Sequence, residues 1–410
     1  MGNMIGSGVF LLPASLAAYR GLSLVGWVVS AGGSVALALV FARLAGFRPA
    51  SGGPYAYTRQ AYGDLAGFLV AWGYWISIWT ANAALAVAFV GYLDPFIPSV
   101  VRNPLAAASL AVGMVWLLTA VNCRGLLAAG RVQLVTTTLK ILPLLLIGIA
   151  GTLAFEPSHF SLTNVEGGIG KGVMATVTLT LFAFVGLESA TVPAGSTADA
   201  RRTIPRATVI GTLLAAAVYL LGTVGVMSLM DPATLAQSTA PFADAARVLA
   251  GDRAAALVAI GAAISCFGAL NGWVLVVGQL PMAVARDGLF PQAFARVSSR
   301  GTPAFAMIVG ATLSTLLVAM NSSRGLVELF TFIILLATLS TLVPYTFCSL
   351  AGIILHRRDR TMSWSTGATV VSGLAFIYAL FAIGGAGPDV VFSGFLLLLA
   401  GLPVYAWVAR

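Results

Sequence analysis

The chain has 410 residues, of which 59% are hydrophobic and only 9% are charged. Its 22 Lys and Arg and 13 Asp and Glu are too few for the surface of a soluble fold, in which about a quarter of the residues are charged. The mean hydropathy of +0.97 agrees with this. The composition excludes a soluble enzyme, a disordered protein and a secreted disulfide scaffold, and it predicts an all-α polytopic membrane protein.

The apolar runs predict about twelve transmembrane helices, because most are long enough to cross a hydrocarbon core about 30 Å thick. In chain order we expect them at 1–18, 22–46, 63–93, 104–122, 131–153, 172–196, 206–230, 255–285, 303–320, 325–351, 363–384 and 388–408. The first run is short and starts without a polar lead-in. We therefore expect either half of a broken helix or a truncated N-terminus, with the true start upstream of Met1.

Arginines are distributed unevenly between the two sides that these spans define. Most of them fall in every second connection, starting with the one between spans 2 and 3, where Arg59 lies. Cytoplasmic loops carry an excess of Lys and Arg. We therefore expect this side and both termini to face the cytoplasm of a bacterial-type cytoplasmic (inner) membrane, with the chain crossing it many times.

Chemistry based on metals, thiols or nucleotides has little support in the sequence. The three cysteines, Cys123, Cys266 and Cys348, fall in or beside apolar runs, and only His159 and His356 could join them as ligands. A nucleotide-binding Gly-x-x-x-x-Gly-Lys-Ser/Thr motif is missing. We therefore expect no metal, no cofactor and no nucleic-acid partner, and a catalytic constellation at membrane depth is absent.

Two apolar spans contain glycine-rich interruptions. Span 1 contains Gly-Ser-Gly at 6–8, and span 6 contains Phe-Val-Gly-Leu-Glu-Ser at 184–189, with a proline at the same distance after each. Such glycines can serve close helix packing. Alternatively, the helices unwind there, as expected for an inverted five-helix repeat that binds its substrate between broken helices. The helix N-termini at such breaks attract a substrate carboxylate.

Only Lys140 and Glu188 are ionisable residues well inside a span. A charge at membrane depth is costly unless it is paired or hydrated, so each is a functional candidate. Glu188 is either a structural hydrogen-bond anchor or a carboxyl that loads and releases a proton. Lys140 is either a structural tether or a cation placed where a sodium ion would otherwise bridge broken helix 1 to span 8.

Three further side chains could reach a central cavity. The indole of Trp273 suits cation–π stacking with an ammonium or guanidinium group, although it could equally be core. Asn82 is either a ligand contact or an interhelical hydrogen-bond partner. Phe182 precedes the interruption of span 6 and could cover a bound ligand, or it could simply pack in the core.

Several segments resemble the amino acid–polyamine–organocation (APC) superfamily: residues 2–13, 52–57, 184–190, 272–273 and 286–291. The resemblance covers nearly the whole chain and is closest to the basic amino acid and polyamine antiporters, such as the arginine/agmatine antiporters. It implies a LeuT-like fold with inverted five-helix repeats at 1–153 and 172–351 and two additional helices at 363–410. It also implies that residues are missing ahead of Met1.

The resemblance implies roles for individual residues of this sequence. Substrate-binding residues would be Asn3, Met4, Ser7, Gly8, Tyr74, Asn82, Phe182, Val185 and Trp273; proton coupling would involve Glu188 and Lys140; gating would involve Tyr55, Phe182 and Tyr345. Phe182 departs from the tryptophan of the arginine/agmatine antiporters, and Lys140 matches a lysine of proton-coupled permeases and neutral amino acid exchangers.

The sequence thus predicts a secondary active transporter, with two alternatives for its substrate. Trp273 and Asn82 favour exchange of an arginine-like basic amino acid for its amine or polyamine product. Phe182, Ala337 and Lys140 favour a proton-coupled or exchanging transporter of neutral amino acids. The expected partners are a small-molecule substrate, protons and the lipid bilayer, and a homodimer is compatible with the sequence.

Overall fold

A computed structural model describes residues 4–47, 52–124, 129–162, 168–191, 199–359 and 364–408. Within these ranges the chain is helical and contains no strand. The α-helices are α1 Ser7–Leu16, α2 Leu22–Phe47, α3 Pro54–Tyr62, α4 Asp64–Gly91, α5 Pro98–Val101, α6 Pro104–Cys123, α7 Ala129–Leu153, α8 Ile169–Leu181, α9 Ala200–Leu229, α10 Pro232–Ala236, α11 Pro241–Arg286, α12 Ala304–Met320, α13 Leu326–Arg358, α14 Thr366–Gly384, α15 Pro388–Leu399 and α16 Gly401–Val408. Short 3₁₀ turns follow several of them, among them η3 Phe182–Phe184 and η4 Ser189–Thr191.

Eight helical segments among the described residues are long and apolar enough to cross a membrane, and four shorter ones are apolar as well. The long ones include α2, α4, α6, α11, α13 and α14, and the short ones include α12. The protein is therefore a multi-pass membrane protein. All of these segments fall at predicted spans, and the complete twelve-span topology stays a prediction.

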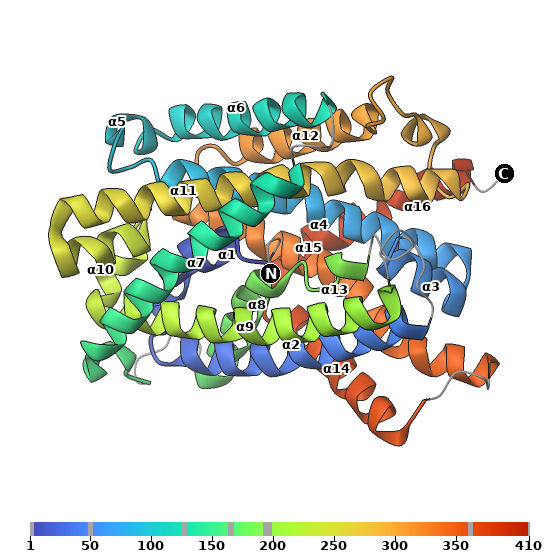
Figure 1. Ribbon diagram of the computed structural model, residues 1–410, viewed down its shortest axis with the longest axis horizontal. Coiled ribbons are helices and arrows are strands. Elements are labelled where there is room, and N and C mark those ends of the chain that lie inside the picture. Colours follow the sequence, from blue (N-terminus) through green and yellow to red (C-terminus); the bar gives the residue numbers. More distant parts are fainter. Residues whose placement is uncertain are drawn as a thin grey trace.

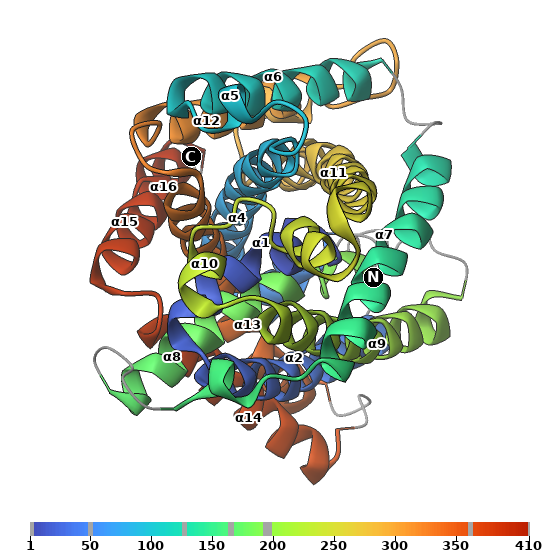
Figure 2. The ribbon, with the colours of Figure 1, turned by 90° about the vertical axis from the view of Figure 1, so that its left-hand side faces the viewer.

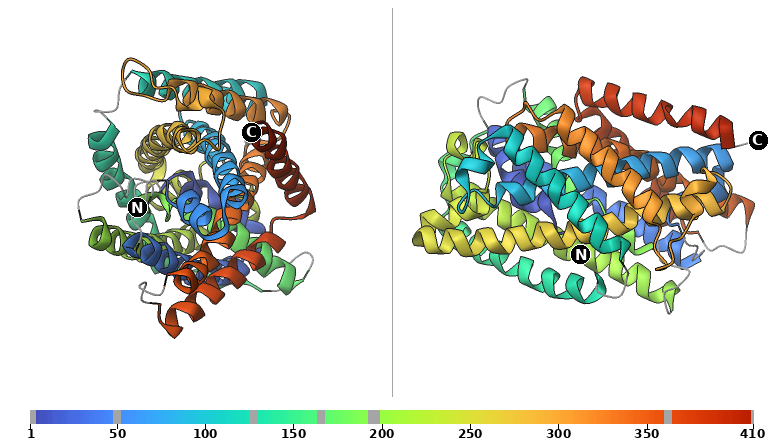
Figure 3. Two further views of the ribbon diagram at one scale, coloured as in Figure 1. Left: turned by 90° about the vertical axis from the view of Figure 1, so that its right-hand side faces the viewer. Right: turned by 90° about the horizontal axis from the view of Figure 1, so that it is seen from above.

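The long helices run along the longest axis of the molecule (Figure 1). Viewed along that axis, α1 and α4 occupy the middle, and α2, α9, α11 and α13 surround them (Figure 2). Helices α6 and α12 lie together on one outer side, and α14 lies on the opposite side. The view from the other end shows the same layers, and the view from above shows the C-terminal helix along one edge (Figure 3).

Helices at corresponding positions of the two predicted repeats pack against one another. Contacts join α2 with α9, α4 with α11, and α6 with α12. Helix α4 is buried along nearly its whole length, whereas α15 and α16 are largely exposed at the surface that would face lipid. The central position of α4 explains why its apolar sequence lacks a polar face: neighbouring helices cover all of it.

The two ends of the bundle differ in charge. Helix α3, the C-terminal end of α11 and the N-terminal end of α9 lie at one end (Figure 1), which carries Arg59, Arg202 and Arg286 and is called the arginine-rich end here. The short helices α5 and α10 lie at the opposite end. This segregation agrees with the loop assignment from the sequence.

Candidate functional site

The start of α1 and the segment after α8, where the sequence predicts helix interruptions, touch each other. Helix α1 begins at Ser7, and the backbone of Gly6 before it is non-helical, with a φ of −141° and a ψ of −139°. Helix α8 ends at Leu181, and the chain continues through η3 to Gly186, whose φ of +104° is unfavourable for other residues. A Cβ atom on Gly8 would lie 3.0 Å from Cα of Ala183, so the backbones of the two interrupted segments are in direct contact.

A small cavity lies between these interruptions and two continuous helices. It has a volume of about 20 Å³ and is lined by Met4, Gly6 and Gly8 from the start of α1, Ala81 and Leu85 from α4, Phe182 and Val185 from the second interruption, and Trp273 from α11. A cavity of this size holds about one water molecule. An amino acid is several times larger, so the lining must move apart before such a ligand enters.

Glycine at positions 6 and 8 lets α1 approach its neighbours this closely. A Cβ atom on Gly6 would lie 3.0 Å from Cδ2 of Leu85 and 3.2 Å from Cβ of Ala269. Both distances are shorter than ordinary carbon–carbon contacts. Ala81 lacks a chemical signature in the sequence, because small residues in apolar helices usually serve packing; only the folded structure identifies it as a cavity residue.

Glu188 is fully buried beside the second interruption and is only partly hydrogen-bonded. Its Oε2 accepts hydrogen bonds from the hydroxyl of Tyr345, at 2.5 Å, and from the backbone N–H of Gly186, at 3.2 Å. Its Oε1 lacks a well-formed hydrogen bond among the described residues, and the hydroxyl of Tyr74 is the group that lies next to the carboxylate. A buried carboxyl between two tyrosine hydroxyls is a candidate for taking up and releasing a proton.

The remaining predicted residues lie at varying distances from the cavity. Asn82 and Tyr74 are buried on α4, and neither lines the cavity. The Oδ1 of Asn82 lacks a hydrogen-bond partner among the described residues, whereas the hydroxyl of Tyr74 lies next to the carboxylate of Glu188. Tyr345 lies on α13, and its hydroxyl donates a hydrogen bond to Glu188. Asn3 lies outside the described residues, as do the side chains of Ser7 and Lys140, although Lys140 belongs to α7.

Tyr55 lies far from the cavity, on α3 at the arginine-rich end. Its hydroxyl donates to Oδ2 of Asp287, at 2.9 Å, and accepts from the guanidinium of Arg59, at 3.2 Å. Arg59 also pairs with Asp287, at 3.2 Å, and with Asp64, at 2.7 Å. Burial raises the pKa of Tyr55, and the hydrogen bond to Asp64 raises the pKa of Arg59. Both side chains therefore remain donors, and they join α3 to the end of α11.

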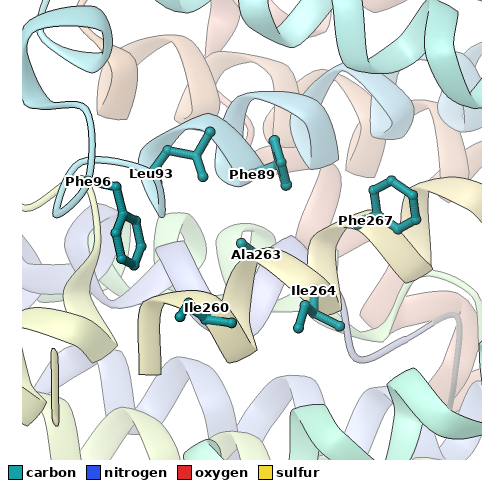
Figure 4. A pocket seen from close by; sticks show the side chains of 7 residues that line it. All are labelled: Phe89, Leu93, Phe96, Ile260, Ala263, Ile264 and Phe267. Atoms are coloured by element: carbon teal, nitrogen blue, oxygen red, sulfur yellow. The ribbon is translucent and has the colours of Figure 1, made fainter. Parts of the chain in front are cut away.

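A larger groove lies elsewhere, between the end of α4 and α11 (Figure 4). Its volume is about 370 Å³, and all the side chains that line it are apolar: Phe89, Leu93, Phe96, Ile260, Ala263, Ile264 and Phe267. It would hold an amino acid by volume. It offers no polar group to bind the carboxylate or ammonium of such a ligand, and burying these groups unpaired is costly. The small central cavity is therefore a better candidate site than this groove.

Metal ligation has no support in the part of the chain that the structure describes. Three or more His, Cys, Asp or Glu side chains gather nowhere within it. The described cysteines, Cys123, Cys266 and Cys348, are not joined by a disulfide bond. The chemistry of the candidate site therefore comes from backbone groups, Trp273, and Glu188 with Tyr345.

Comparisons with known proteins match the chain over its full length. The family model described as Amino acid permease matches residues 1–409. The cadaverine/lysine antiporter of Escherichia coli (strain K12) is 33% identical over 99% of this chain and 92% of the relative. The putative arginine/ornithine antiporter of Bacillus subtilis (strain 168) is 32% identical, over 100% and 95% of the two chains. The putrescine transporter PotE of Haemophilus influenzae is 31% identical, over 100% and 94%. These findings confirm the resemblance that the motifs indicate.

Proposed function

The chain belongs to the amino acid permease family, and on that basis we propose that it exchanges a basic amino acid for an amine or polyamine by alternating access. The observation that carries this proposal is the small cavity between the start of α1 and the segment after α8. A site between two helix breaks suits a carrier that opens to one side at a time. A channel would need a continuous path instead.

The cavity suits a ligand with an amino acid head group and a cationic end. Helix α1 begins beside the cavity, so its first backbone N–H groups and its dipole favour a carboxylate there. Asn3, Met4, Ser7 and Gly8 would bind the α-amino and carboxylate groups. Trp273 would stack on the distal cation. The named relatives handle lysine, arginine, ornithine, cadaverine and putrescine, which supports a basic substrate over the neutral alternative.

Proton coupling is assigned to Glu188 and Lys140. Glu188 is a buried carboxyl, and the hydroxyl of Tyr345 donates a hydrogen bond to it. A proton taken up there would change the charge next to the bound substrate. Lys140 lies in the middle of α7, which packs against α11. Its ammonium would supply the cation that sodium-coupled carriers recruit from solution.

The aromatic residues around the cavity would act as gates. The ring of Phe182 lines the cavity and packs edge-on against Phe330 of α13, with the ring centroids 6.2 Å apart. Opening would move this ring away from Trp273. Tyr345 would release Glu188 during the same change, and the contacts of Tyr55 would open at the arginine-rich end. We propose that this end faces the cytoplasm of a bacterial inner membrane.

Exchange by purified protein in liposomes tests the proposed function. Liposomes loaded with unlabelled lysine should take up labelled arginine, lysine, ornithine, cadaverine or putrescine, and empty liposomes should take up far less. Labelled leucine should enter at the background rate. Exchange confined to leucine and other neutral amino acids would contradict the proposal, as would uptake that does not depend on the internal substrate.

A further inference from the structure

Tyr92 joins three separate parts of the chain at the end of the bundle opposite the arginine-rich end. Its hydroxyl donates a hydrogen bond to the carbonyl oxygen of Phe10, at 2.6 Å, and accepts one from the backbone N–H of Phe242, at 3.4 Å. Tyr92 directly follows α4, Phe10 is in α1, and Phe242 is in the first turn of α11. The hydroxyl of Tyr92 therefore connects α1, α4 and α11. Its partners are backbone groups, which do not depend on the side chains at positions 10 and 242.

Aromatic rings close the same junction around these hydrogen bonds. The ring of Phe10 packs edge-on against Tyr92, at 5.8 Å between centroids, and against Phe242, at 5.4 Å. All three side chains are completely buried. A Cβ atom on Gly91 would lie only 2.4 Å from the carbonyl oxygen of Thr239, so α4 touches the chain that leads into α11. The junction is therefore tightly packed.

The junction lies between the cavity and that end of the bundle. Phe10 follows the cavity residue Gly8 in α1, and Tyr92 lies about 10 Å beyond the cavity residue Leu85, as two turns of helix require. Both helices run from the cavity toward the junction. A ligand leaving the cavity along α1 and α4 in this direction must therefore pass between Phe10, Tyr92 and Phe242.

The segment that carries Phe242 has a backbone break that separates it from the rest of α11. Ala250 and Gly251 are non-helical, with a φ of +76° at Gly251, and a Cβ on Gly251 would meet no atom within 4 Å. Residues 241–249 thus form a short helix attached through an uncrowded break. Such a segment can change its angle without disturbing the part of α11 that carries Trp273, as hinge segments do.

From these contacts we propose that Tyr92 is a gating residue: its hydroxyl holds the site closed toward the end opposite the arginine-rich end. The inference rests on the proposed alternating access. During opening, the carbonyl of Phe10 and the N–H of Phe242 would exchange the tyrosine hydroxyl for water. Because an intramolecular hydrogen bond replaced by water has a small net effect on stability, this contact suits a gate that must open in every transport cycle.

Thiol labelling from each side of the membrane tests the role of Tyr92. The reporter is Leu85→Cys, which places a thiol in the cavity, in a chain whose Cys123, Cys266 and Cys348 are replaced by alanine. Tyr92→Phe removes only the hydroxyl and keeps the ring. A membrane-impermeant maleimide applied from the Tyr92 side should then label the reporter roughly threefold to tenfold faster, as expected for the loss of one or two hydrogen bonds. Labelling from the arginine-rich side should stay the same or fall.

Tyr219→Phe is the matched control. Tyr219 is also completely buried, and its hydroxyl has no hydrogen-bond partner among the described residues, so this variant should label like the parent. Equal acceleration from both sides in Tyr92→Phe would indicate general loosening and overturn the inference. An unchanged rate, or the same acceleration in Tyr219→Phe, would overturn it as well. Failure of lysine and cadaverine to protect the reporter would instead contradict the proposed substrate site, whatever the effect of Tyr92→Phe.

Discussion

At the scale of single residues, Glu188 is a carboxyl group in an environment that favours its neutral form. It is fully buried within a membrane-spanning bundle, and no basic side chain pairs with it among the described residues. Its described neighbours are the hydroxyls of Tyr345 and Tyr74 and the N–H of Gly186. A buried carboxyl without a counter-charge suits a group that takes up and releases a proton during transport.

Replacing Glu188 with glutamine should separate proton coupling from substrate binding. Glu188→Gln keeps the shape and the acceptor for Tyr345 but cannot change its charge. We expect exchange in liposomes to lose most of its pH dependence between pH 5 and 8, while substrate binding changes only modestly. Glu328→Gln is the control, because Glu328 is exposed and pairs with Arg324 at 3.0 Å at the opposite end. A parental pH profile in Glu188→Gln would refute the proton role.

Trp273 should contribute to the affinity for cationic ligands. An indole stacked on a desolvated cation contributes on the order of 1–2 kcal/mol. Trp273→Leu should therefore weaken lysine or cadaverine binding roughly 5- to 30-fold in calorimetric titration. Trp116→Leu, on the outer helix α6, should leave the affinity unchanged. Equal binding by the Trp273→Leu variant and the parent would show that this indole is only part of the core.

The sequence identifies some site residues and hides others for physical reasons. Glu188 stands out because charges inside apolar spans are rare. Its pairing with Tyr345 is not predictable from sequence, because it depends on how α13 is rotated relative to the second interruption. Ala81 is equally hidden, since nothing distinguishes it from other small residues in apolar helices. Polar residues inside apolar spans can be recognised from this sequence, whereas the shape of the cavity cannot.

At the scale of helices, small residues set the closest approach between α7 and α9. A Cβ atom on Gly225 would lie 2.5 Å from the carbonyl oxygen of Ile147 and 2.6 Å from Cα of Gly148. The backbones are therefore in direct contact, as in membrane helix pairs with small residues at the interface. This contact fixes the position of α7 against α9. Because α7 carries Lys140, the packing of the two helices also determines where the proposed cation lies.

A single methyl group at this contact should destabilise the protein. Gly225→Ala should lower the unfolding free energy by about 1–3 kcal/mol, the usual effect of overpacking. The measurement is the thermal unfolding midpoint of purified protein in detergent. Gly373→Ala in α14 is the control, because a Cβ atom there would meet no atom within 4 Å. Equal midpoints for the two variants would show that α7 and α9 can separate freely.

The positions of the helices can be predicted from the apolar runs, but the breaks within the helices are harder to predict. The window predicted at 255–285 lies within α11, yet the helix starts at Pro241 and bends at Ala250 and Gly251. The sequence contains 45 glycines, and apolar composition alone does not show which of them adopt a positive φ. The non-helical backbone at Gly6 and Gly186 is easier to predict, because each glycine lies beside a polar residue in an otherwise apolar run.

At the scale of the whole molecule, contacts between helices hold the bundle together at both of its ends. The contacts among Tyr55, Arg59 and Asp287 join helices at the arginine-rich end, and those of Tyr92 join helices at the other. The cavity between them holds about one water molecule. A carrier that works by alternating access would loosen one set of contacts at a time, and the bound ligand would supply the energy difference between the two openings.

Transport should not require sodium, because Lys140 would supply the cation within the bundle. Lys140→Met keeps the apolar stem and removes the charge, so exchange should slow by roughly tenfold or more, the effect of losing a hydrogen bond from a charged group. The measurement is lysine exchange in sodium-free liposomes for the parent and the variant. Strict sodium dependence of the parent, or full activity of Lys140→Met, would contradict this role.

The central claim is that both exchanged substrates use one small cavity, one molecule at a time. Competition calorimetry with purified protein tests it most directly. Lysine should bind with one molecule per chain, and added cadaverine should raise its apparent Kd in proportion to the cadaverine concentration while the stoichiometry stays at one. Simultaneous binding of both ligands, with an unchanged lysine Kd in saturating cadaverine, would contradict the account.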